Sequence, residues 1–283
     1  SSPGSTLKAA IDTGKVEIIS NQIAEKLIIK PTKDRAEGII VLNKINGERE
    51  FLHSNLIVLC ASTIQSLRLL LNSNENNQED GFIENSGLLG SNLMDHISSC
   101  RFFSLPNLNK NSNSITNELS GAGSFFIPFG NKPNNYKNKN FIRGYGIWGA
   151  IDRFEPPGFL KKKPNSKIGF LIGHGEVLPC KENKVTLSNK KDKWGINVPY
   201  IDIKWGNNEK NMVKHMNKTM EESIVSVGGE MLPLNEILHL PFSGKIINNL
   251  FATQKAAPPP GYYIHEVGGA PMGLSEESSV LNK

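Results

Sequence analysis

Short apolar runs of strand length recur through the first hundred residues. They are rich in Val, Ile and Leu and predict β-strands, because such residues fit a pleated, half-buried surface. Asn46 and Gly47 separate the last two runs, and this dipeptide favours a tight type I′ hairpin because both residues tolerate a positive φ. The four predicted strands cover residues 16–20, 24–30, 37–43 and 48–53.

A fifth run differs from these because it is apolar without a break. Residues 56–60 (LIVLC) suit a strand that is buried on both faces, as in a parallel sheet. Ser62 and Thr63 together are the predicted N-cap, and residues 64–71 carry helix formers. α/β proteins use such a strand, turn and helix to bind dinucleotides at the carboxyl ends of their strands.

From about residue 100 polar and apolar segments alternate along the chain. Three segments rich in Asn, Lys and Ser, residues 74–80, 107–117 and 131–140, predict surface loops. Several of the short apolar segments alternate as strands do, and we expect one antiparallel sheet from them. These segments cover residues 124–129, 141–150, 168–172, 184–188 and 198–204.

The clearest helical pattern covers residues 208–227. Met212, Met216, Met220 and Ile224 recur every four residues and therefore lie on one helix face. A stripe of this kind is typical of core packing rather than of a ligand surface.

The composition is that of a folded chain. With 283 residues, of which 38% are hydrophobic and 21% charged, the chain allows one or two domains and is too apolar to be disordered. No apolar run approaches the ~18 residues of a spanning helix, so we expect no membrane span. The three cysteines form no CxxC pair, which argues against a disulfide scaffold or a zinc module. The net charge is +5, but the sequence has no basic stripe interleaved with aromatic residues. We therefore expect the charges to lie on a solvated surface and expect no nucleic-acid partner.

A GxGxxG pattern at residues 144–149 lacks the context of a dinucleotide fingerprint. That fingerprint follows a strand and opens a helix, whereas prolines follow here and the bulky residues inside the pattern suit a strand. We therefore interpret the match as coincidence.

His265 is the strongest candidate for chemistry among the histidines. An apolar strand leads into it and a Gly-rich turn follows, so its imidazole can face a cleft and take a proton from an alcohol. These residues alone leave a structural role equally open. The Asp95–His96 pair suits a structural role, and His174, in a Gly-His-Gly sequence, fits either role.

Three segments together resemble the glucose–methanol–choline (GMC) oxidoreductases, which are FAD-dependent alcohol and sugar oxidases and dehydrogenases. Residues 56–71 (LIVLCASTIQSLRLLL) are similar to the second family signature, a strand followed by GSPQLLLLSG. Residues 90–96 (GSNLMDH) are similar to GxNLxDH, and residues 265–273 (HEVGGAPMG) are similar to HxxGxxxMG. Their order and spacing agree with the family, and the surrounding sequence is similar to bacterial members of the sugar-dehydrogenase type.

The resemblance implies an α/β (α+β) fold in three parts. Residues 1–96 would form part of a FAD-binding Rossmann-like domain with a β-meander. Residues 97–260 would form a substrate domain, with an antiparallel sheet backed by helices, and residues 261–283 would return to the FAD domain. The implied cofactor is FAD, and the implied partner is a small-molecule alcohol or sugar substrate.

The resemblance also assigns roles to single residues. His265 matches the catalytic histidine, which takes the hydroxyl proton while hydride leaves for flavin N5. Ala24 matches a backbone contact on the adenine side of FAD, and Cys60 and Ala61 match the segment near the dinucleotide. Asn92 matches a loop residue close to the flavin. No metal site is implied, and the substrate, the electron acceptor and the cellular location stay open.

The chain departs from the family pattern inside the signature and at both ends. Leu67 stands where the family usually has Pro, and Ser62 and Gln65 stand where it has Gly, which reshapes the turn. The family's GxGxxG unit would precede residue 1, and its second active-site His or Asn would follow residue 283. We therefore expect a fragment that binds FAD weakly or not at all by itself. The alternatives are a non-catalytic truncated or split-gene chain that needs a partner, and a carbohydrate-binding β domain.

Overall fold

The computed structural model divides the chain into two compact units. The first comprises Ser1–Asn92, Lys184–Ile201 and Gly268–Lys283, and the second comprises Leu93–Asn183 and Asp202–Val267. Most of the three predicted polar loops lies outside the residues that the structure describes. Those residues are 4–30, 32, 35–74, 82, 84–106, 123–131, 139–151, 158–163, 166–237 and 257–282.

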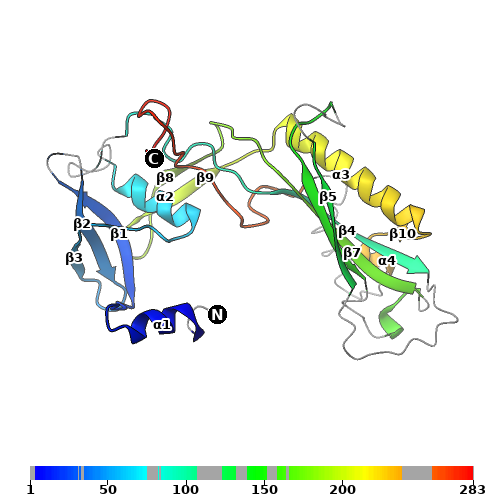
Figure 1. Ribbon diagram of the computed structural model, residues 1–283, viewed down its shortest axis with the longest axis horizontal. Coiled ribbons are helices and arrows are strands. Elements are labelled where there is room, and N and C mark those ends of the chain that lie inside the picture. Colours follow the sequence, from blue (N-terminus) through cyan, green and yellow to red (C-terminus); the bar gives the residue numbers. More distant parts are fainter. Residues whose placement is uncertain are drawn as a thin grey trace. The chain divides into compact units, whose positions relative to one another are not determined.

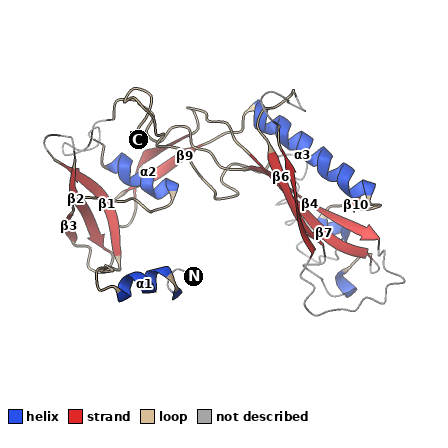
Figure 2. Ribbon diagram, in the orientation of Figure 1, coloured by secondary structure: helices blue, strands red, loops and turns tan. Residues whose placement is uncertain are grey.

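A three-stranded antiparallel meander forms the larger sheet of the first unit (Figures 1 and 2). β1 (Gln22–Ile29), β2 (Ala36–Asn43) and β3 (Arg49–His53) pair in chain order, which confirms three of the predicted strands. The prediction for residues 16–20 is wrong, because this segment forms no strand and its Ile18 is 55% exposed.

The turn between β2 and β3 is longer than the predicted two-residue type I′ turn. Gly47 has a φ of +78°, but Asn46 does not share the positive φ that this turn type requires. The Asn43 side chain instead accepts the backbone N–H groups of Ile45 at 2.9 Å and Asn46 at 3.4 Å. This Asx turn bends the chain before the glycine is reached, so the connection is wider.

α2 (Thr63–Asn72) packs against β1 and confirms the predicted helix. Ser62 caps its first turn, as expected. At the other end the buried Ser73 hydroxyl donates to the carbonyl oxygen of Leu69 at 2.6 Å and accepts the N–H of Leu27 at 2.8 Å. One side chain therefore joins the end of the helix to the strand.

The apolar run 56–60 is not the buried strand that its pattern predicts. It pairs with no strand among the described residues, and Leu56 and Val58 are 79% and 71% exposed. The alternate side chains, Ile57 and Leu59, pack against the core of the first unit. An apolar run is buried on both faces only where layers cover both of them, and the described residues cover one.

A separate two-stranded sheet, β8 (Lys184–Lys191) and β9 (Asn197–Asp202), packs on α2. The guanidinium of Arg68 reaches its turn and donates to the Asp192 carboxylate at 2.7 Å and to two carbonyl oxygens. The prediction of one common antiparallel sheet is therefore wrong for these two strands. Residues 184–201 cluster with the first unit, although they lie inside the predicted range of the substrate domain.

The second unit is built on a five-stranded antiparallel sheet in the order β10–β4–β7–β6–β5. The strand β4 escaped prediction because it places Ser, Cys and Arg side chains among its apolar residues. The GxGxxG pattern lies in and beside β6, where Gly146 leaves room for the ring of Phe126. The strands are β4 (Ile97–Pro106), β5 (Gly123–Phe129), β6 (Tyr145–Ile151), β7 (Ser166–Gly175) and β10 (Glu230–Met231).

α3 (Asn207–Ser226) lies across one face of this sheet (Figure 1). Met212, Met216 and Met220 are fully buried, which confirms the predicted core stripe. A Cβ on Gly173 of β7 would lie 2.1 Å from the sulfur of Met216, so the helix rests directly on a glycine of the sheet.

The remaining elements are short. They are α1 (Thr6–Asp12), the 3₁₀ helix η2 (Gly158–Leu160) and α4 (Leu234–Ile237). Across the described ranges, no helix combines the length and the apolar character needed to cross a membrane.

Candidate active site

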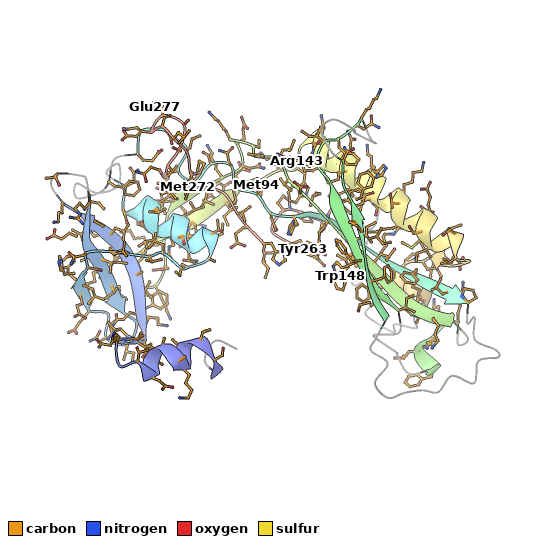
Figure 3. All side chains as sticks on the ribbon, viewed as in Figure 1. Met94, Arg143, Trp148, Tyr263, Met272 and Glu277 are labelled. Atoms are coloured by element: carbon orange, nitrogen blue, oxygen red, sulfur yellow. The ribbon has the colours of Figure 1, made fainter. Side chains whose placement is uncertain are left out.

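Two sequence motifs that are about 170 residues apart meet in the second unit, just before β4. Met94 and Val267 exchange two backbone hydrogen bonds of 2.9 Å each, so the GSNLMDH and HEVGG segments run antiparallel beside each other. Met94 and Tyr263 are labelled in Figure 3. Pairing of the two segments brings His265 next to the start of the sheet.

The side chain of Asp95 strengthens this junction. Its Oδ1 accepts the backbone N–H groups of His96 at 2.7 Å and His265 at 3.1 Å. Its Oδ2 accepts the N–H of Tyr263 at 3.3 Å. Asp95 is only 6% exposed, so these hydrogen bonds take the place of water around its carboxylate.

Three imidazoles and one phenol form a contiguous ring cluster. His174, which lies opposite Ser98 in the β4–β7 ladder, stacks on His96 with a centroid distance of 5.5 Å. His265 meets His96 edge to face at 5.2 Å, and Tyr263 meets His174 edge to face at 4.2 Å. His265 is the exposed member of the four rings, so it is open to a ligand.

Burial controls the protonation of the inner members of this cluster. Desolvation, aided by the neighbouring His96 and His265, lowers the pKa of His174 from 6.5 to about 4. His174 is therefore neutral at physiological pH, and its buried Nε2 has no hydrogen-bond partner within the described part of the chain. Desolvation also raises the pKa of Tyr263, so its phenol stays protonated beside Ser98.

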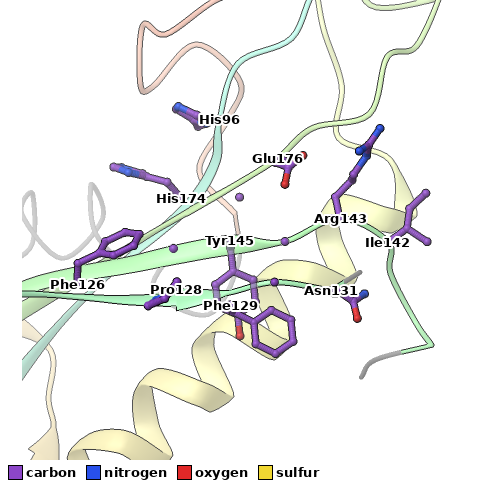
Figure 4. A pocket seen from close by; sticks show the side chains of 14 residues that line it. His96, Phe126, Pro128, Phe129, Asn131, Ile142, Arg143, Tyr145, His174 and Glu176 are labelled. Atoms are coloured by element: carbon purple, nitrogen blue, oxygen red, sulfur yellow. The ribbon is translucent and has the colours of Figure 1, made fainter. Parts of the chain in front are cut away.

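A cavity of about 620 Å³ opens beside His96 and His174 (Figure 4). This volume suits a small-molecule ligand. Its wall combines aromatic faces with polar groups of both charges, a mixture that can hold the carbon skeleton and the hydroxyl groups of an alcohol. The side chains of this wall include Phe126, Phe129, Tyr145, Arg143 and Glu176.

The four residues predicted to contact FAD all lie in the first unit, whereas His265 lies in the second. Ala24 is exposed on β1. Cys60 and Ala61 are also exposed and directly precede the N-cap of α2, where a helix dipole favours an anion. Asn92 has a φ of +60° in the loop that ends the first segment of this unit. Small side chains and open backbone at residues 24, 60 and 61 fit the close approach of a dinucleotide.

Asp95 and Tyr263 are the members of the site that sequence reasoning missed. Asp95 stood inside the GSNLMDH motif, and a structural role was expected for the Asp–His pair. Tyr263 belongs to the apolar segment that leads into His265, with no polar pattern around it. Only contacts between distant segments reveal what either residue does.

Two comparisons with known proteins indicate what this chain is similar to. Residues 1–98 match the model of the GMC oxidoreductase family, whose N-terminal domain is a FAD-binding Rossmann-like domain. A curated 2-methyl-1,2-propanediol dehydrogenase from Mycolicibacterium austroafricanum is 24% identical over 275 residues. These residues cover 88% of this chain and 44% of that dehydrogenase, so the chain spans less than half of the relative's length. The two matches together support a member of the GMC oxidoreductase family.

Proposed function

We propose that this chain belongs to a FAD-dependent oxidoreductase that converts CH–OH groups to carbonyls, with His265 as the base. The observation that carries the proposal is the exposed imidazole of His265 in the ring cluster, held next to a cavity-lining histidine. Family membership and the dehydrogenase relative support the same class of reaction.

His265 takes the hydroxyl proton of the bound alcohol. Histidine suits this step because it exchanges a proton near neutral pH, and removal of the proton makes the carbon a far better hydride donor. Bound FAD would supply the acceptor for the hydride that leaves this carbon. With one proton taken up by His265 and the hydride accepted in this way, the C–O bond of the alcohol would become a C=O bond.

Residues of the first unit would hold the cofactor. Ala24 would contact the adenine side through its backbone, and Cys60 and Ala61 would pass near the dinucleotide at the start of α2. Asn92 would lie close to the flavin. In this proposal residues 1–96 and 261–283 serve the FAD domain and residues 97–260 serve the substrate.

The cavity supports a sugar or another polyol as the substrate. Arg143 and Glu176 line the cavity and can bond to hydroxyl groups of the substrate. Phe126 and Tyr145 can pack on the carbon skeleton. The name of the curated relative specifies a diol, which is of the same chemical class.

The test uses the FAD-loaded protein that contains this chain. It measures anaerobic reduction of the flavin by glucose, glycerol and 1,2-propanediol through the flavin's visible absorbance. We expect His265→Gln to slow reduction about 100- to 10,000-fold, the contribution of a positioned general base, with flavin content unchanged. An exposed histidine of β3, His53, supplies the matched control His53→Gln, which should reduce at the native rate. Native-rate reduction in His265→Gln would refute the role of the base. Sugar binding without any flavin reduction in the native protein would favour a carbohydrate-binding domain instead.

A further inference from the structure

The backbone next to His265 adopts a conformation that its residues disfavour. Ile264 has a φ of +52°, although a β-branched side chain clashes with the backbone in this left-handed region. Its side chain is 79% exposed, so packing of that side chain does not explain the conformation. Something else must hold the backbone at this residue.

The carboxylate of Asp95 accepts backbone hydrogen bonds from the residues on both sides of Ile264. One oxygen accepts the N–H of Tyr263 and the other accepts the N–H of His265, at 3.3 and 3.1 Å. The N–H groups on both sides of Ile264 converge on this one carboxylate, and the backbone turns between them. The second N–H that Asp95 Oδ1 accepts, from His96 at 2.7 Å, fixes the carboxylate to its own segment of the chain, just before β4.

The turn controls where the side chains go. With Ile264 directed to solvent, its neighbours Tyr263 and His265 direct their rings into the ring cluster, against His174 and His96. A relaxed turn with a negative φ at Ile264 would change the direction of the chain at His265.

We propose that Asp95 is a positioning residue for His265, which it places by holding the strained turn at Ile264. The consequence for catalysis rests on the proposed function, but the placement itself does not. A carboxylate suits the task because hydrogen bonds from N–H groups to a charged oxygen are stronger than those to a neutral one. An amide of the same shape has a single acceptor oxygen and would point N–H groups at one of its present partners.

The first experiment observes the native chain without any substitution. NMR of the isotope-labelled chain should show coupling across the hydrogen bond from the His265 amide nitrogen to the Asp95 carboxyl carbon. It should also show nuclear Overhauser contacts between the His96 and His265 rings. Absence of both signals in the folded native chain would overturn the proposal.

The second experiment compares Asp95→Asn with Asp192→Asn. Asp192 is a matched control because its carboxylate also accepts two backbone N–H groups, from Trp194 and Ile196, but in the first unit. In Asp95→Asn we expect amide exchange at residues 263 and 265 to accelerate roughly tenfold, the loss of one net hydrogen bond, and the ring contacts to weaken. Asp192→Asn should leave both unchanged, and native protection in Asp95→Asn would overturn the proposal.

The catalytic consequence is measured in the FAD-loaded protein. Asp95→Asn should lower kcat with less effect on KM, because the base is misplaced while the cavity stays intact. If the native protein oxidises no alcohol, the proposed function fails, whereas the NMR results still decide the role of Asp95. A third outcome is that Asp95→Asn shows the NMR changes but keeps the native kcat. Asp95 would then hold the turn without positioning the base, and the proposal would fail.

Discussion

Acidification should destabilise the second unit through His174. Its pKa is about 4 in the folded protein and 6.5 as the ordinary value. As pH falls below 6.5 the unfolded chain takes up a proton that the folded chain refuses until about pH 4. The stability tied to this histidine is therefore complete above 6.5, declines between 6.5 and about 4, and is constant below. At about 1.4 kcal/mol per pH unit the loss reaches about 3 kcal/mol.

The assay is urea unfolding at a series of pH values, followed by tryptophan fluorescence, to which Trp148 of the same sheet contributes. His174→Gln has no titrating group at this position. Between pH 6.5 and about 4, the free energy of unfolding of the native chain should therefore fall by about 3 kcal/mol more than that of the variant. The other titrating groups are common to both proteins, so their contributions cancel in the difference except for the coupling of His174 to His96, His265 and Asp95. NMR titration of the His174 ring gives an independent value of its pKa. Identical pH dependence in the two proteins, with His174 titrating near 6.5, would refute the reasoning.

Three further predictions concern packing and anchoring. In urea unfolding, Met216→Ala should lower the free energy of unfolding by about 2–5 kcal/mol and Gly173→Ala by about 1–3 kcal/mol. The double variant should lower it by less than the sum, because the methyl group added at residue 173 fills part of the cavity left at residue 216. Thiol labelling should modify exposed Cys60 quickly and Cys100 slowly, because burial raises the pKa of Cys100 to about 11, and Cys60→Ser should remove a fast phase. Arg68→Met should destabilise the first unit by about 1–3 kcal/mol in the same unfolding assay, because it leaves the hydrogen-bond partners of the guanidinium unpaired.

The elements that sequence reasoning predicted well are those with a strong local pattern. The four-residue repeat of apolar side chains defines α3 and its buried face, and alternating runs with a turn between them define β2 and β3. The prediction for residues 56–60 failed because burial of this run depends on which other elements cover it. The residues of the run carry no information about those elements. β4 escaped prediction because its polar side chains are buried with partners inside the protein. Ser99, for example, donates a hydrogen bond to Asn217 of α3.

The sequence by itself determined the meander, the two longer helices and the histidine to which the GMC-like motifs point. Those features follow from residues that are near one another in the chain, where periodicity and backbone preference act directly. Tertiary structure alone decided that Asp95 accepts hydrogen bonds from Tyr263 and His265, which are 168 and 170 positions away in the chain. It also decided that His174 stacks on His96 and stays neutral. Such contacts depend on which strands become neighbours, and desolvation depends on everything packed around a group, so neither can be read from a local pattern.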